Sequence, residues 1–197
     1  MKLDIHTHIL PQRLPNLKER YGYGGWINIR EDEKDKSIAN MYKDDVFFRR
    51  IEKNCWCLEE RCKDMHATNV DAQVLSTVPV MFSYWAKSEH TNDLSHLIND
   101  DMAEQIRVQQ TEAQMNDANK ALFYGFGTVP MQEPLYAVEE MTRCCKDLGF
   151  RGIQIGSHIN DWNLDEKKLY PIWKVCELNF SYYPKKLRKL EGEKLLI

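Results

Sequence analysis

Two histidines lie one residue apart near the start of the chain, in the segment DIHTHI. The neighbouring Leu3, Ile5 and Ile9 are typical of a β-strand that is buried on both faces, as in a parallel sheet. Because side chains alternate along a strand, His6 and His8 are expected to point to the same side. Two adjacent imidazoles in a buried strand need partners for their ring nitrogens. We therefore predict that they bind a divalent metal ion, the alternative being two histidines satisfied by hydrogen bonds in the core.

Zinc suits neutral imidazole, and a catalytic zinc ion takes three protein ligands and a water. Two histidines therefore do not complete a site, and the other histidines of the chain must be considered. His66, His90 and His96 lie in helical or exposed stretches, where solvated surface positions are expected. His158 follows a predicted strand, so it is a candidate for the same rim, although more as a lining residue than as a ligand.

Strand and helix patterns alternate along most of the chain, which favours a parallel sheet with crossover helices. The segments 11–26 and 30–45 interrupt this order: the first is predicted to be an irregular connection and the second an exposed, charged stretch. After the first strand, the predicted strands are 71–79, 121–130 and 152–159, with a short one beginning at 46, and the predicted helices are 58–68, Leu94–Ile106, 134–149 and 165–177.

Two of these strands end on the same tripeptide, Thr-Val-Pro, at 77–79 and at 128–130. Proline cannot donate to a strand ladder, so it marks the end of each strand. Repeated strand ends of this kind fit a barrel whose active site lies at the C-terminal rim. A complete eight-stranded barrel takes about 250 residues. We therefore predict an α/β fold, a partial (β/α)8 TIM-type barrel with about four of the eight βα units, and unpaired edges on its first and fourth strands.

Composition excludes several classes of function. The net charge of −3 gives no reason to expect nucleic acid or an anionic membrane as a partner. No segment approaches the roughly 18 apolar residues of a membrane helix, and no secretory signal is recognisable. The six cysteines are typical of reduced thiols. A cytoplasmic (cytosolic) protein is the expectation.

Several segments together resemble one enzyme family. They are DIHTHILP, YGYGGW, LSTVPVMFSYWAK, GTVPMQ and LGFRGIQIGSHINDWNL, within residues 1–177. They are similar to the 2-amino-3-carboxymuconate-6-semialdehyde decarboxylases, a family of metal-dependent α/β barrels in the amidohydrolase superfamily. The resemblance implies zinc-dependent, non-oxidative decarboxylation of 2-amino-3-carboxymuconate 6-semialdehyde to 2-aminomuconate 6-semialdehyde and CO₂, in tryptophan degradation through the kynurenine pathway. It matches His6 and His8 to the first two metal ligands, and Arg49 to an arginine that binds a substrate carboxylate.

The resemblance ends near Glu177. The family continues into a strand that closes on His-Pro-Trp and carries the third metal ligand, whereas this chain reads LNFSYYPKKLRKLEGEKLLI. The family's later acid–base histidine and metal-binding aspartate have no counterpart, so no catalytic acid–base residue is assigned. We expect residues 1–177 to be the N-terminal half of an amidohydrolase-type barrel and 178–197 to be a divergent tail, as in a C-terminally truncated or mis-spliced form.

Three functional hypotheses remain open from the sequence. The first is the decarboxylase. The second is a catalytically inactive fragment that forms a homodimer or associates with full-length subunits. The third is a metal-dependent hydrolase with another substrate, which the segment STVPVMFSYWAK and Arg49 disfavour.

Overall fold

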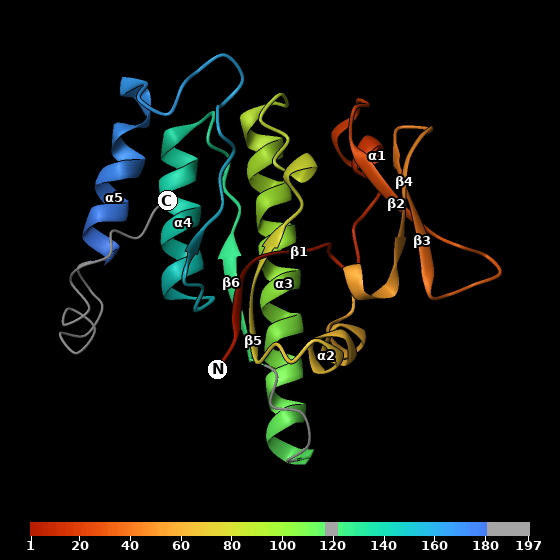
Figure 1. Cartoon of the computed structure of the whole chain (residues 1–197). Helices are drawn as coiled ribbons and strands as arrows, with labels where there is room; N and C mark the ends of the chain where they lie inside the picture. Colours follow the sequence, from red (N-terminus) through yellow and green to blue (C-terminus); the bar gives the residue numbers. More distant parts are fainter. Residues whose placement is uncertain (117–121, 181–197) are drawn as a thin grey trace.

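The computed structural model describes residues 1–116 and 122–180 of the chain, and Figure 1 shows their arrangement. The strands form two sheets. A parallel sheet has the order β1 (Leu3–Ile9), β5 (Ala72–Thr77), β6 (Leu122–Gly127) and β7 (Gly152–Ile153). An antiparallel sheet has the order β2 (Ile27–Glu31), β3 (Ile38–Lys43) and β4 (Val46–Glu52).

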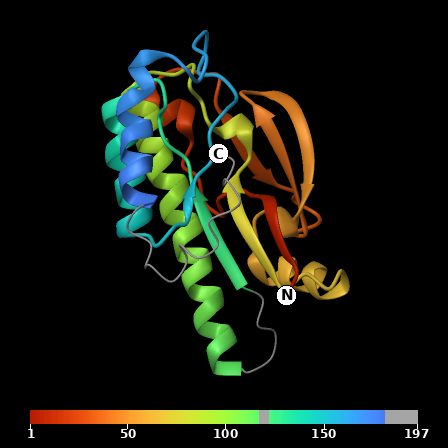
Figure 2. The same ribbon diagram turned by 60° about the vertical axis from the view of Figure 1, so that its left-hand side comes forward.

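Helices connect the parallel strands, as the sequence pattern predicts. They are α1 (Leu17–Tyr21), α2 (Leu58–Ala67), α3 (Ser88–Asn116), α4 (Pro134–Lys146) and α5 (Tyr170–Phe180), with short 3₁₀ turns η1 (Lys53–Cys55), η2 (Pro79–Met81) and η3 (Lys167–Leu169). Figures 1 and 2 show α3, α4 and α5 side by side on one face of the parallel sheet. The predicted tail from 181 onward lies outside the described residues.

Helix α4 packs closely on β6 because two positions of that strand are glycine. A Cβ at Gly125 would lie 2.4 Å from Cδ1 of Phe150, and a Cβ at Gly127 would lie 2.6 Å from Sγ of Cys144. Phe123, two residues earlier on the same face, is fully buried in the same cluster. The missing side chains therefore let the helix and the following loop approach the strand backbone.

The prediction of a first strand buried on both faces is wrong for its beginning. Leu3 and Ile5 expose 43% and 66% of their surface, whereas Thr7 and Ile9 are buried. β1 is an outer strand of the parallel sheet in the described part of the chain, and its pairing with β5 is irregular between Asp4 and Thr7, where the exposed first half meets the buried second half. The fourth strand is also shorter than predicted, since β7 spans two residues rather than 152–159.

The prediction that residues 30–45 form an exposed charged stretch is also wrong, because part of this segment belongs to the antiparallel sheet. This segment supplies parts of β2 and β3, and Ala39 and Met41 are buried together with Ile51 of β4. Polar residues dominate the composition of the segment, but every second residue of β3 faces the core. Tertiary contact with this alternate set, and not the average polarity, decides the structure.

A buried carboxylate holds α3 against α4. Glu140 accepts hydrogen bonds from Asn99 Nδ2 at 2.6 Å and from Arg143 Nε at 2.7 Å, and His96 Nε2 lies 2.7 Å from its Oε2. Asn99 also donates to the carbonyl of Thr128, just beyond β6, at 2.8 Å. Burial by itself would raise the pKa of Glu140, but the hydrogen bonds from His96, Arg143 and Asn99 outweigh it and lower this pKa to about 2.

We expect Gly127→Ala to destabilise the fold by about 1–3 kcal/mol, because the added methyl overlaps the buried Cys144 sulfur. Urea denaturation followed by circular dichroism measures the change. Gly152→Ala is the matched control, since its nearest contact would be 3.3 Å. Equal midpoints for Gly127→Ala and the wild type would contradict the tight packing of α4 on β6.

The Glu140 cluster also predicts how stability depends on pH. The hydrogen bond to Glu140 raises the pKa of His96 above its ordinary 6.5, so this contribution is fully present below pH 6.5 and is lost as pH rises through the folded-state pKa. The contribution is about 1 kcal/mol, because the His96 side chain is 44% exposed and solvent screens it. We expect the wild type to lose its advantage over His96→Gln in urea denaturation as the pH rises above 6.5 and through the raised folded-state pKa of His96. A constant difference between the two proteins as the pH rises would show that His96 is not charged in the fold.

Candidate metal and carboxylate site

The two histidines of β1 lie next to each other. Their ring centroids are 5.1 Å apart, and the rings meet edge to face at 78°. The parallel pairing of β1 with β5 sets His8 opposite Ser76. Both rings lie near the C-terminal end of β1, before the connection to α1. Their short distance is the one expected for two side chains on the same side of the strand. Their role as metal ligands remains a prediction.

The hydrogen bonds around His8 select one tautomer of its ring. Ser76 Oγ donates its single hydrogen to the carbonyl of Thr7 at 3.0 Å, so it can only accept from His8 Nδ1, which lies 3.2 Å away. His8 Nδ1 therefore carries the proton, and Nε2 keeps its lone pair. Burial, followed by the neighbouring His6, lowers the pKa of His8, which favours the neutral ring at neutral pH. A neutral imidazole with one nitrogen held by a second residue is the usual state of a metal-binding histidine.

A half-buried arginine fixes the backbone of the same strand end. Arg61 of α2 donates from Nη2 to the carbonyl of His8 at 2.6 Å and to the carbonyl of Asn54 at 2.8 Å. It therefore ties β1 to the turn that follows β4. Nothing in the sequence distinguishes Arg61 from an arginine on the solvated face of a helix, so only the structure reveals this role.

A β-bulge in β4 determines the face of the antiparallel sheet on which the Arg49 side chain lies. Met41 of β3 pairs with Arg49, but the next residue, Tyr42, pairs with Phe47, so Phe48 is the extra residue of β4. Paired residues of antiparallel strands point to the same face. Arg49 therefore shares a face with the buried Met41, while Phe47 lies on the other face against Tyr42, with ring centroids 5.9 Å apart.

The guanidinium of Arg49 makes no hydrogen bond or ion pair with any other described residue, so all five of its donors remain open to a ligand. A guanidinium with free donors can hold a carboxylate through two parallel hydrogen bonds. No direct hydrogen bond links it to the two histidines in the described part of the chain. The structure thus places the imidazoles of His6 and His8 next to each other and leaves Arg49 without a partner among the described residues. That all three act on one substrate is a proposal.

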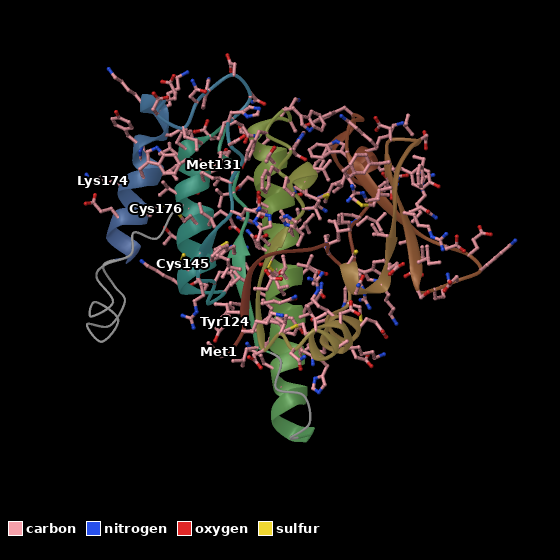
Figure 3. All side chains as sticks on the ribbon, in the orientation of Figure 1. Met1, Tyr124, Met131, Cys145, Lys174 and Cys176 are labelled. Carbon is pink, nitrogen blue, oxygen red and sulfur yellow. The ribbon has the colours of Figure 1, made fainter. Side chains whose placement is uncertain are left out.

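A groove of about 580 Å³ lies beside the loops that follow β5 and β7. In Figure 3, Met131, which follows β6, lies at the end of the molecule opposite Met1, and the loops after the neighbouring parallel strands run toward the same end. Two hydrogen bonds join the two loops of the groove: Gly156 N–H donates to Tyr84 Oη at 3.2 Å, and Asn160 Nδ2 donates to the Tyr84 carbonyl at 2.9 Å. Burial raises the pKa of Tyr84 to about 12, so its hydroxyl stays neutral. His158, the predicted rim residue, lines this groove.

The remaining histidines differ in their surroundings, and the prediction of solvated positions is wrong for two of them. His66 is exposed as predicted. His90 stacks on Tyr21, with centroids 4.7 Å apart, and its Nδ1 lies 2.9 Å from Tyr23 Oη. His96 is bound to the buried Glu140. Long-range packing of α3 against α1 and α4 creates both environments, which helical spacing alone does not show.

The described residues contain no cluster of three or more histidine, cysteine, aspartate or glutamate side chains that could hold a metal ion. His6 and His8 fit a divalent metal as two nitrogen donors of an incomplete set. All six cysteines are free thiols, in keeping with the prediction from composition. Among the described helices, none has the length and apolar character needed to cross a membrane.

Comparison with known families identifies the fold. The family model described as Amidohydrolase matches residues 3–178. The chain belongs to this amidohydrolase family. It is 45% identical over 177 residues to the 2-amino-3-carboxymuconate-6-semialdehyde decarboxylase of Dictyostelium discoideum, covering 90% of this chain and 46% of the relative. Identity to the Caenorhabditis elegans enzyme of the same name is 35% over 190 residues, with coverage of 89% and 46%. The chain thus spans about half the length of these relatives.

Solved structures of family members confirm the partial barrel. A dihydroxybenzoic acid decarboxylase from a Polaromonas species, with bound manganese and 2-nitroresorcinol, matches with a TM-score of 0.62 at 21% identity, over 98% of this chain and 53% of that one. A 5-carboxyvanillate decarboxylase from Novosphingobium aromaticivorans, with manganese and 4-hydroxy-3-methoxy-5-nitrobenzoic acid, matches with a TM-score of 0.55 at 27% identity, over 71% and 41%. The chain is therefore a member of a decarboxylase group of amidohydrolases, and these relatives bind a divalent metal.

The serine behind His8 provides a test of the metal site. We expect Ser76→Ala to weaken zinc binding about tenfold, because His8 loses the acceptor that keeps its proton on Nδ1. Competition with a chromophoric chelator measures the zinc Kd. Ser95→Ala is the matched control, since Ser95 is equally buried but its hydroxyl bonds to the Thr91 carbonyl inside α3. Unchanged zinc affinity in Ser76→Ala would mean that Ser76 does not orient His8 as a ligand.

Proposed function

We propose that this chain supplies the first metal ligands and the carboxylate-binding arginine of a carboxy-lyase active in the cytosol. The reaction is the zinc-dependent, non-oxidative decarboxylation of 2-amino-3-carboxymuconate 6-semialdehyde to 2-aminomuconate 6-semialdehyde and CO₂. The observation that carries the proposal is the geometry at the end of β1: two adjacent imidazoles with ring centroids 5.1 Å apart, of which His8 has its Nδ1 held by Ser76 Oγ at 3.2 Å. The 45% identity to a decarboxylase of this name supports the choice of substrate.

The residues of the chain have separate tasks in this reaction. His6 and His8 would hold the zinc ion, and Arg61 keeps the backbone of His8 in place. A metal held by these residues would supply Lewis-acid chemistry, which makes a base available near neutral pH. Arg49 would hold a carboxylate of the substrate in a fixed orientation through two hydrogen bonds. We assign zinc because two imidazoles suit it, although the two relatives described above hold manganese.

The described residues contain no group of three or more possible metal ligands, so we propose that the remaining ligands and the acid–base group come from other residues. The test therefore joins the chain with the part of the Dictyostelium relative that follows the matched 177 residues. The two pieces are co-expressed and supplied with zinc, and the loss of the semialdehyde's absorbance is followed.

We expect turnover that His8→Ala abolishes and that Arg49→Met lowers at least a hundredfold in kcat/KM, because a charge-assisted bidentate contact is lost. Arg50→Met is the matched control: Arg50 pairs with Asn40, on the face of the sheet opposite to Arg49, and its loss should leave turnover unchanged. Equal effects of Arg49→Met and Arg50→Met would contradict the role of Arg49, and hydrolysis without release of CO₂ would contradict the reaction.

A second candidate function is an inactive chain that associates with full-length subunits or with itself as a homodimer. The exposed Leu3 and Ile5 on the outer strand of the parallel sheet favour it, because an uncovered strand edge is a template for pairing with another chain. In the same experiment, co-migration with the full-length Dictyostelium enzyme on size exclusion, without turnover in any combination, would support this candidate over the first.

A further inference from the structure

The turn that joins β3 to β4 carries a carboxylate that binds a distant loop. The turn consists of Asp44 and Asp45, since β3 ends at residue 43 and β4 begins at residue 46. The N–H of Gly25 donates to both carboxylate oxygens of Asp44, each at 2.8 Å. The N–H of Asp44 in turn donates to the carbonyl of Trp26 at 3.1 Å. Hydrogen bonds in both directions therefore join the turn to the segment that precedes β2.

Two glycines make this contact possible. A Cβ at Gly24 would lie 2.6 Å from Oδ1 of Asp44, so a side chain there would exclude the carboxylate. A Cβ at Gly25, whose φ is 98°, would lie 2.6 Å from Cη2 of Trp85, a residue between β5 and α3. The two glycines thus touch the β3–β4 turn on one side and the Trp85 ring on another. They connect the antiparallel sheet with the loop that follows β5 of the parallel sheet.

The two aspartates of the turn have different surroundings. Asp44 has a φ of 54°, in the left-handed region that aspartate and asparagine adopt more readily than other residues with a side chain, and its carboxylate is bound to the loop. The side chain of Asp45 is 83% exposed, and its carboxylate forms a surface ion pair with Arg30 at 3.0 Å. Asp44 is therefore the residue of the turn that contacts the rest of the fold.

Arg49 lies between two fixed points of β4. Ile51 is the buried residue of this strand and packs in the core of the antiparallel sheet. Asp44 holds the opposite end, where the strand leaves the turn. Residues 46–50 between these points are exposed and pair with β3. A shift of about 1 Å in a positioning element weakens the contact that it supports, so the place of the Arg49 guanidinium depends on both ends of the strand.

From these contacts we propose that Asp44 is a positioning residue for Arg49. Its carboxylate, bound to the Gly25 N–H, fixes the turn end of β4 against the glycine loop and so holds the Arg49 guanidinium where a substrate carboxylate binds. Asp44 acts through the strand and does not itself contact the substrate. The inference rests on the proposed function, because it names the residue that holds the carboxylate-binding arginine of that site in place.

Hydrogen exchange of the full chain tests the anchor without turnover. Asp44→Gly removes the carboxylate and suits the left-handed backbone, so the turn still forms. Asp45→Gly is the matched control, since it places the same flexible residue in the same turn. Followed by mass spectrometry, exchange at residues 46–50 is expected to be about tenfold faster in Asp44→Gly and unchanged in Asp45→Gly, with β5 unchanged in both. Unchanged exchange in Asp44→Gly, or equal acceleration in the two variants, would overturn the proposal.

Turnover of the co-expressed pair then tests the link to Arg49. We expect Asp44→Gly to raise KM about tenfold and to leave kcat within about twofold, because substrate binding by Arg49 is weakened and the chemistry is not. A merely structural defect would lower the apparent kcat and leave KM unchanged. Asp44→Asn keeps one acceptor oxygen and tolerates the left-handed backbone, so it should recover most of the loss in KM. In the Arg49→Met variant, Asp44→Gly should have no further effect on kcat/KM.

Additive effects of Asp44→Gly and Arg49→Met would overturn the proposal, and so would a wild-type KM in Asp44→Gly. Failed turnover of the wild-type pair, together with the expected change in exchange, would reject the decarboxylase while the anchoring of β4 by Asp44 stands. Turnover of the wild-type pair without any change in exchange in Asp44→Gly would reject only the role of Asp44.

Discussion

The parallel register between β1 and β5 is the constraint on which the site depends. It places His8 opposite Ser76, so that one hydroxyl can bridge the Thr7 carbonyl and the His8 ring. A slip by one residue would turn both imidazoles to the other face of the sheet and separate His8 from Ser76, which holds its Nδ1. Arg61 stabilises this end of β1, because it donates hydrogen bonds to the carbonyl of His8 and to the carbonyl of Asn54 in the turn after β4.

The antiparallel sheet contributes a cationic side chain, Arg49, whose direction depends on a β-bulge in β4 and not on regular strand pairing. Without the bulge at Phe48, Arg49 would alternate in step with Phe47 and share its face. The extra residue reverses this relation and brings Arg49 to the face of Met41. Lys43 reaches the groove by its place at the end of β3. Arg49 and Lys43, neither of which has an ion pair among the described residues, therefore come from a bulge and a strand end of a small sheet, while the parallel sheet supplies the imidazoles.

The helical layer supports the strand ends at a distance. Glu140 collects donors from both α3 and α4, and Asn99 extends the same network to the backbone just after β6. A carboxylate buried this deeply is tolerated only because Asn99, Arg143 and His96 satisfy it. The glycines of β6 bring α4 close enough for this network to form, so packing and polar contacts depend on each other.

Local pattern determined much of this protein. The alternation of strands and helices, the paired imidazoles on one strand and the strand ends at Thr-Val-Pro follow from local spacing and residue type, and the structure confirms the order of the parallel strands and the helices between them. The sequence also carried the family, since the matched region covers residues 3–178. These features are local in the chain, where spacing and residue type are sufficient.

Only the tertiary structure decided the rest. The antiparallel sheet, the direction of Arg49, the roles of Arg61 and His96, and the hydrogen bonds of Asp44 each depend on contacts between residues far apart in the sequence. The polar composition of the segment around β3 gave no indication of a strand. No local signal distinguishes a solvated arginine from Arg61, which binds the backbone of β1. The physical reason is that burial and hydrogen bonding are properties of pairs of segments, which a pattern within one segment does not contain.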